Sequence, residues 1–74
     1  MIPEEQFLKD LRELLETDED ITMDTDLLEI DSWGSLSAVE FLSMAEEKYG
    51  ITVKPFAVAE AILVEDLYRI ANGR

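Results

Sequence analysis

Apolar residues at the start of the chain recur with the spacing of an amphipathic helix. At about 100° per residue, those between positions 3 and 16 fall within one arc of a helical wheel. Pro3 suits a first helical turn, and Glu4 and Glu5 follow it, where the positive end of a helix dipole favours acids. The pattern predicts a helix over residues 3–16 with a buried face of Phe7, Leu8, Leu11, Leu14 and Leu15 and a solvated face of Lys9, Asp10, Arg12, Glu13 and Glu16.

The helical period is lost between residues 17 and 34. Loops longer than about 12–15 residues without structure of their own are uncommon and are usually functional. Apolar residues are interspersed with acidic ones in this segment, so we expect the loop to be ordered and pinned to the core. Its acidic residues are Asp18, Glu19, Asp20, Asp24, Asp26, Glu29 and Asp31.

A second helix is predicted over residues 36–49, with Gly34 and Ser35 at its start and Gly50 after its end. One side of its wheel supplies the expected core contacts, and the opposite side is polar except for Leu36 and Met44. Single apolar surface residues are common, but two within an acidic face are also typical of a docking surface. The predicted core side is Ala38, Leu42, Ala45 and Tyr49, flanked by Val39 and Phe41, and the polar side is Ser37, Glu40, Ser43 and Glu47.

The remainder of the chain predicts two further helices. Pro55 opens a short Ala-rich helix that reaches about Ile62, and a final helix begins at Val64 and ends before Gly73. A chain of 74 residues has apolar surface for one small core, so residues 1–74 form a single domain. The predicted fold class is all-α, with three main helices, one short helix and a long loop after the first helix.

The composition disfavours several classes of function. The chain has 18 Asp and Glu against 6 Lys and Arg, and its formal charge of −12 disfavours nucleic-acid binding. It has no Cys and no His, so it lacks the usual nucleophile and general base, and we expect no catalytic residues of its own. No apolar run approaches the roughly 18–20 residues that cross a bilayer, and no leader precedes the first helix. We therefore expect a cytoplasmic protein without membrane insertion. We also expect a monomer.

The acidic loop does not predict a metal site. Asp18, Asp20, Thr22 and Glu29 have the spacing of positions 1, 3, 5 and 12 of an EF-hand loop. Position 6, which needs a turn-making glycine, is Met23. Loose attraction of divalent cations to the acidic surface is the stronger expectation.

Two segments resemble acyl carrier proteins and peptidyl carrier proteins. Residues 34–41, Gly-Ser-Leu-Ser-Ala-Val-Glu-Phe, are similar to the Asp-Ser-Leu segment of that family, and residues 46–50 are similar to the end of its acidic helix. The helix layout matches from about residue 4 to residue 72. The resemblance implies a four-helix acyl-carrier-like bundle in which a phosphopantetheinyl transferase attaches 4′-phosphopantetheine from coenzyme A to Ser35. It also implies that basic patches of partner enzymes contact Glu40, Glu46 and Glu47.

Two serines compete for the attachment site, because Asp31-Ser32-Trp33 also has the form Asp-Ser-apolar. Spacing favours Ser35, since a helix beginning there runs directly into the acidic residues before Tyr49. A helix from Ser32 would carry one extra turn and would contain Gly34 near its start. Ser32 remains the alternative.

The physical chemistry of the segment agrees with the resemblance. A serine at a helix start lies beside free backbone N–H groups, and a phosphodiester there would sit at the positive end of the dipole. A tethered thiol would supply the nucleophile that a chain without Cys lacks.

The segment departs from the family pattern at three positions. Gly34 replaces the usual Asp, so the transferase would lack one carboxylate, which we expect Asp31 to supply. Ser37 stands where an acid is common and has capping-box spacing with Glu40. Leu63 replaces a capping Thr, so we expect a less sharply defined start to the last helix.

The resulting prediction is a carrier protein that holds an acyl or aminoacyl group as a thioester and delivers it to separate loading and synthase enzymes. The docking face would have Leu36 and Met44 as its apolar centre and Glu40 and Glu47 as steering charges. Trp33 would contact the prosthetic group or partners, or would anchor the long loop. The pathway (fatty acid, polyketide or nonribosomal peptide) stays open, as does the alternative of an acidic helical adaptor that binds a basic protein without a prosthetic group.

Overall fold

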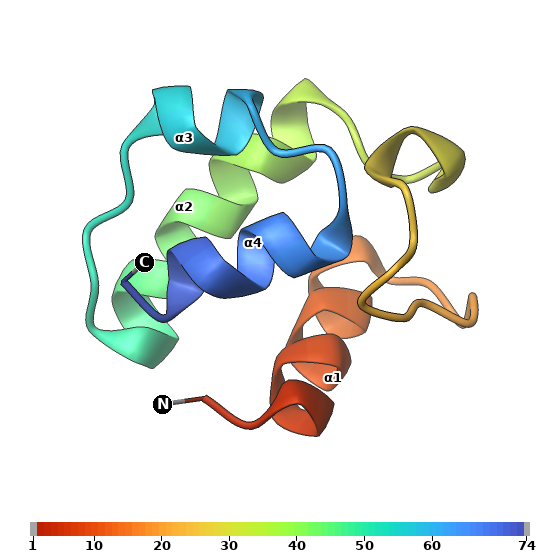
Figure 1. Cartoon of the computed structure of the whole chain (residues 1–74), viewed down its shortest axis with the longest axis horizontal. Coiled ribbons are helices and arrows are strands. Elements are labelled where there is room, and N and C mark those ends of the chain that lie inside the picture. The colour runs from red at the N-terminus through yellow and green to blue at the C-terminus, as the bar shows by residue number, and fades with distance from the viewer. Residues whose placement is uncertain (1, 74) are drawn as a thin grey trace.

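The computed structural model describes residues 2–73, which form four α-helices and one short 3-10 helix (Figure 1). The elements in chain order are α1 (Glu4–Leu15), η1 (Leu27–Glu29), α2 (Ser35–Tyr49), α3 (Pro55–Ala59) and α4 (Val64–Ala71). The all-α prediction is confirmed, and all four helices begin within one residue of their predicted starts. Helix α3 ends at Ala59, earlier than the predicted position near Ile62.

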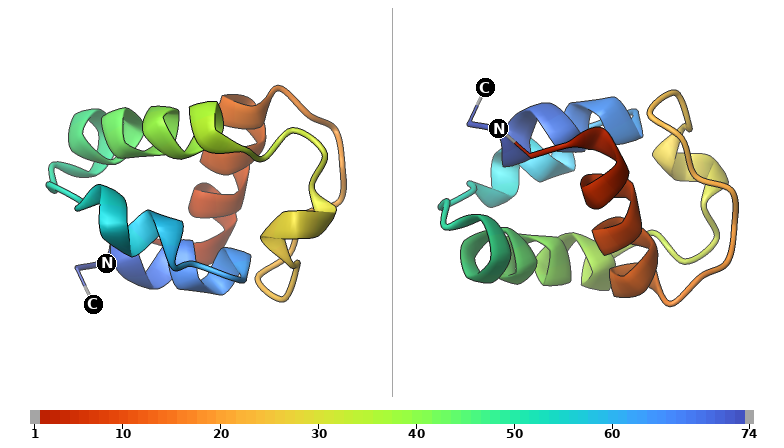
Figure 2. Two further views of the ribbon diagram at one scale, coloured as in Figure 1. Left: turned by 90° about the horizontal axis from the view of Figure 1, so that it is seen from above. Right: turned by 90° about the horizontal axis from the view of Figure 1, so that it is seen from below.

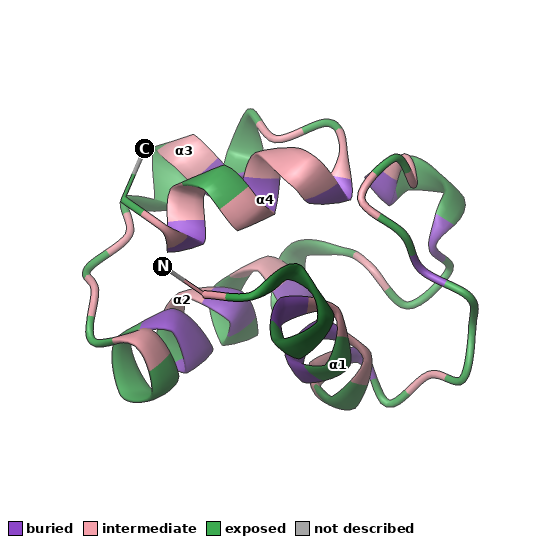
Figure 3. Cartoon of the chain, turned by 60° about the horizontal axis from the view of Figure 1, so that its bottom comes forward, coloured by how far each residue is buried: buried purple, intermediate pink, exposed green. Residues whose placement is uncertain are grey.

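The four helices enclose one core. Helix α1 packs against α2, α2 against α3, and α3 against α4 (Figure 2). Buried residues line the inward faces of the helices (Figure 3). Phe7 lies at the centre, with its ring centroid 6.2 Å from that of Phe41, 6.3 Å from that of Tyr49 and 5.3 Å from that of Tyr68. These aromatic rings fill the space between the helices.

The long loop between α1 and α2 is pinned to the core, as its sequence predicts. Its residues Ile21, Leu27 and Ile30 are buried. Its backbone also pairs with the linker between α3 and α4: the Leu27 N–H donates to the Ile62 carbonyl at 2.9 Å, and the Val64 N–H donates to the Thr25 carbonyl at 3.0 Å. Hydrogen bonds between segments so distant in sequence fix the position from which α2 begins.

The buried face of α2 differs from the prediction. The expectation that Met44 is exposed is wrong, because its exposed fraction is 8%, and Ser37 is buried as well. Val39, expected beside the core, is 58% exposed. The physical reason is that α1 packs against the side of α2 that carries Met44, which rotates the buried arc away from Val39.

A buried carboxylate joins α1 to α2. Asp10, predicted on the solvated face of α1, is only 3% exposed, so that expectation is also wrong. Its side chain accepts hydrogen bonds from the Tyr49 hydroxyl at 2.7 Å, from Gln6 Nε2 at 2.8 Å and from Lys48 Nζ at 3.3 Å. Burial is the largest single influence and opposes ionisation, but the three hydrogen bonds and the positive charge of Lys48 together outweigh it and lower the pKa of Asp10. Burial and the bond to Asp10 raise the pKa of Tyr49.

Helix α4 has a well-formed start without a capping Thr. The Asp66 carboxylate accepts hydrogen bonds from the backbone N–H groups of Leu63 at 2.9 Å and Ile62 at 3.0 Å. These two bonds hold the pKa of Asp66 below its usual value. The expectation of a poorly defined start is therefore wrong, because an acid inside the first turn satisfies the N–H groups that precede it.

No helix within residues 2–73 has the length and apolar character that a membrane crossing requires.

Candidate functional site

The start of α2 presents an exposed hydroxyl at a helix N-terminus. Gly34 is the N-cap residue in an extended conformation, and Ser35 is the first residue of the helix and is exposed. The first backbone bond of the helix runs from the Ala38 N–H to the Gly34 carbonyl at 3.0 Å. The N–H groups of Ser35, Leu36 and Ser37 therefore precede the helical ladder and lie at the positive end of its dipole.

Ser32 lies outside this arrangement. It is exposed, like Ser35, but it occupies the turn before α2. Its carbonyl accepts a hydrogen bond from the buried Ser37 hydroxyl at 2.6 Å, which ties the turn to the helix. Ser37 does not form the capping box with Glu40 that its spacing predicts, because it is the third residue of the helix and the N-cap residue is Gly34. Of the two candidate serines, only Ser35 combines exposure with the helix N-terminus.

An apolar groove adjoins Ser35. It has a volume of about 440 Å³ and lies between η1, the start of α2 and α3. Trp33 lines this groove while its ring lies edge-on to Phe41 at a centroid distance of 6.5 Å. Trp33 therefore anchors the turn on the core, as one of its two predicted roles requires, and also faces the space beside the serine. The other lining residues are Leu27, Leu28, Gly34, Ala38, Val58, Ala59, Glu60, Ala61 and Ile62.

The predicted docking residues are distributed over the turn before α2 and along α2 itself. Leu36 is 73% exposed, beside the candidate attachment site, which confirms its predicted exposure. Asp31, in the turn before α2, and Glu46, near the end of α2, are exposed but separate from each other. Glu40, Met44 and Glu47 are brought together along one side of α2, where they face α1 across a groove.

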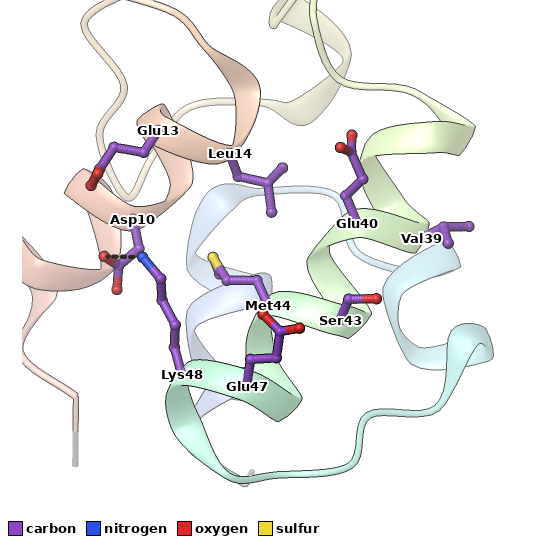
Figure 4. A pocket seen from close by; sticks show the side chains of 9 residues that line it. All are labelled: Asp10, Glu13, Leu14, Val39, Glu40, Ser43, Met44, Glu47 and Lys48. Atoms are coloured by element: carbon purple, nitrogen blue, oxygen red, sulfur yellow. Dashed lines mark hydrogen bonds and ion pairs between the residues drawn. The ribbon is translucent and has the colours of Figure 1, made fainter.

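We name this second depression the α1–α2 groove; its volume is about 420 Å³ (Figure 4). It is lined by Asp10, Glu13, Leu14, Val39, Glu40, Ser43, Met44, Glu47 and Lys48. Met44 extends from α2 toward α1 and forms part of the floor, so its contribution comes from within the groove and not from an exposed apolar centre. The sequence did not indicate Glu13 and Leu14 as site residues, because the crossing of two helices leaves no local signal.

Within residues 2–73, no group of three or more His, Cys, Asp or Glu side chains is arranged to hold a metal ion.

Comparison with known proteins places the start of α2 inside a known type of domain. A family model described as a phosphopantetheine attachment site matches residues 5–69. This range runs from the first turn of α1 into α4 and includes both candidate serines. No curated protein and no solved structure matches the chain.

Proposed function

The chain belongs to the phosphopantetheine-attachment family of acyl and peptidyl carrier proteins, and from this premise we propose that Ser35 carries the 4′-phosphopantetheine group. The observation that carries the proposal is the exposed Ser35 hydroxyl on the first turn of a 15-residue helix. A phosphodiester formed there would accept hydrogen bonds from N–H groups that have no helical partner. The space beside Gly34 is also open, since a Cβ built on this residue would meet no atom within 4 Å outside Gly34 and its two chain neighbours.

The bound group supplies a thiol that forms a thioester with an acyl or aminoacyl cargo. The chain's own residues hold and present it. It has no Cys and no His of its own, so we propose that it is a tethered substrate for other enzymes and not itself an enzyme. Fatty acid, polyketide and nonribosomal peptide synthesis share this thioester chemistry, and we propose that the carrier serves one of them through separate loading and synthase enzymes.

Partner recognition in this proposal combines an apolar contact with acidic steering. Leu36 lies next to the attachment hydroxyl, and Glu40, Glu46 and Glu47 follow it along α2. Exposed carboxylates accelerate encounters with basic surfaces but add little affinity, and salt weakens their effect. Such complexes form and separate quickly, which suits a carrier that visits several enzymes. Its charge of −12 also disfavours self-association, so we expect a monomer.

Asp31 is proposed to replace the carboxylate that Gly34 lacks. Both residues lie in the approach to α2, and Asp31 is exposed and available to a transferase. If Asp31→Ala leaves the rate of modification unchanged, this compensation is absent.

The proposed attachment is tested by intact mass after incubation with coenzyme A and a promiscuous phosphopantetheinyl transferase. We expect a single gain equal to one phosphopantetheine in the wild type and in Ser32→Ala, and no gain in Ser35→Ala. A gain that is lost only in Ser32→Ala would move the site to the turn. No gain in any of the three proteins would support the adaptor alternative.

The proposed steering charges are tested by the rate of the same reaction. Glu40→Lys and Glu47→Lys should slow modification without changing the thermal unfolding midpoint by more than a few degrees. Glu5→Lys, an exposed acid in the first turn of α1, is the control with the same net charge. Equal rates for all three variants would mean that the reaction depends on net charge and not on whether the altered charge lies on α2.

A further inference from the structure

We propose that Asp66 is a positioning residue for the apolar groove beside Ser35, because its carboxylate holds the linker that forms one side of that groove. The linker is residues 60–63, between α3 and α4. Asp66 is not among the residues that line the groove, so it acts through the linker. The effect on the groove is independent of the proposed function, and only the effect on modification rests on it.

The groove has one side from η1 and one side from the linker. Leu27 and Leu28 of η1 line it, and so do Glu60, Ala61 and Ile62 of the linker. Leu28 is 91% exposed and Ile62 is 63% exposed. Neither of these two apolar side chains is fixed by burial, so the distance between the two sides depends on the backbone.

One backbone hydrogen bond joins the two sides. The Leu27 N–H donates to the Ile62 carbonyl at 2.9 Å. Leu27 is buried, so the core fixes its end of the bond. The linker follows α3, which has only five residues and is too short to be stable alone. The Ile62 end of the bond therefore needs a further anchor.

Asp66 provides this anchor. The N–H groups of Ile62, at 3.0 Å, and Leu63, at 2.9 Å, both donate to its Oδ2 atom. Asp66 lies in the first turn of α4 between Val64 and Leu67, which are both fully buried. Ile62 is thus held through its N–H by a helix that is fixed in the core, and through its carbonyl by η1.

The next two N–H groups of the chain are satisfied by the long loop instead. The Val64 N–H donates to the Thr25 carbonyl at 3.0 Å. The Glu65 N–H donates to the Met23 carbonyl at 2.9 Å. Figure 2 shows η1 beside the start of α4. Neither bond involves the Asp66 side chain, so its removal should loosen the linker and leave α4 attached to the loop.

A loosened linker should affect modification through binding. Ser35 and Ile62 line the same groove, so an enzyme that approaches the Ser35 hydroxyl meets the linker beside it. Asp66→Ala should raise the KM of the transferase reaction, by at most about five-fold, because a smaller fraction of the molecules then has the linker in place. The kcat should not change, since the hydroxyl stays on the first turn of α2.

NMR spectra of the full chain report on the linker directly. We expect the Leu27 amide to exchange with deuterium about five-fold faster in Asp66→Ala than in the wild type, which is the effect of one lost helix cap. The Val64 amide should change less, since its bond to the loop remains. The indole N–H signal of Trp33, which lines the groove, should shift in the same variant.

Three further variants separate positioning from stability and from charge. Asp66→Asn keeps an amide oxygen that can accept both bonds, so it should restore the wild-type values. Glu65→Ala removes an acid from the same turn, but this carboxylate pairs with Arg69 at 3.1 Å and not with the linker. Tyr68→Phe removes a hydrogen bond to the Ile2 carbonyl, and neither residue lines the groove. The last two variants should leave the KM, the ratio of the two exchange rates and the indole signal unchanged.

Several results would overturn the proposal. Equal acceleration of the Leu27 and Val64 amides would mean that Asp66 stabilises the domain only as a whole. No recovery in Asp66→Asn would exclude a role as hydrogen-bond acceptor for the linker. Faster exchange with an unchanged KM would refute the positioning role in modification. Absence of modification in the wild type would refute the attachment proposal alone, since the exchange and indole measurements require no prosthetic group.

Discussion

The hydrogen bond from Tyr49 to Asp10 gives a prediction whose size follows from the structure. Tyr49→Phe removes the hydroxyl that donates at 2.7 Å to a carboxylate that is almost completely buried. A hydrogen bond to a charged group contributes about 1.5–3 kcal/mol to stability. Gln6 and Lys48 still bind Asp10 in the variant, so the carboxylate keeps partners and the larger cost of an isolated buried charge does not arise.

This loss is large for so small a domain. At roughly 0.05–0.15 kcal/mol per residue, a chain of 74 residues has an unfolding free energy of roughly 4–11 kcal/mol. A loss of about 1.5–3 kcal/mol should lower the unfolding midpoint by roughly 6–24 °C, since 1 kcal/mol corresponds to about 4–8 °C at this size.

The loss should also depend on pH. Because the folded pKa of Asp10 is lowered, its contribution to stability is present above its unfolded pKa of about 3.9 and disappears as the pH falls through the folded value. Removing the Tyr49 hydroxyl leaves burial less opposed and therefore raises the folded pKa. The stability difference between wild type and Tyr49→Phe should be greatest near neutral pH and should shrink below about pH 4.

Urea unfolding followed through the single tryptophan, Trp33, measures these differences. The matched control is Tyr68→Phe, which removes a hydroxyl that donates to the uncharged Ile2 carbonyl. It should cost only about 0.5–1.5 kcal/mol, with no dependence on pH in the acid range. Equal losses for the two variants, with the same pH profile, would refute the assignment of Asp10 as a charged buried acceptor.

Four further predictions concern the backbone, the cap of α4 and the charge. Gly34→Asp should stabilise the domain by a few tenths of a kcal/mol in thermal unfolding, because Gly34 is an extended N-cap position with open space around it. The variant should also be modified faster, because it restores the carboxylate that the transferase lacks at this position; a slower reaction would contradict this. Gly50→Ala should cost about 1–2 kcal/mol in urea unfolding, since its φ of +68° is left-handed, and an unchanged midpoint would oppose that reason. Asp66→Ala should cost about 1 kcal/mol at neutral pH, and the cost should shrink as the pH falls below the ordinary carboxyl pKa of about 3.9 and through the lowered folded pKa of Asp66; a loss independent of pH would exclude a role for its charge. Added salt should raise the melting temperature by screening a net charge of −12, and a midpoint independent of ionic strength would contradict this.

Local sequence signals predicted the helices well because their causes are local. Pro55 and Gly50 set helix ends through their own backbone preferences, and the last helix begins at Val64, as predicted. The candidate serine at the start of α2 was also visible, since exposure and helix position follow from neighbouring residues.

The side-chain environment was less predictable because it depends on where helices cross. Met44 and Asp10 were both expected in solvent, yet α1 and α2 pack across each other at these residues. A wheel drawn for one helix contains no information about the direction from which its neighbour approaches. For the same reason the sequence did not indicate that Glu13 lines a groove, since the groove forms only where Glu13 faces Glu40 and Glu47 of another helix.

The pairing of the long loop with the α3–α4 linker has a consequence for local opening. The amide hydrogens of Leu27, Val64 and Glu65 are all held by bonds between these two segments. When the two segments separate, all three amide hydrogens are exposed together. They should therefore exchange with deuterium at a common free energy of opening, as one cooperative unit. The long loop that leads into the first turn of α2 is thus held in place by residues more than thirty positions further along the chain.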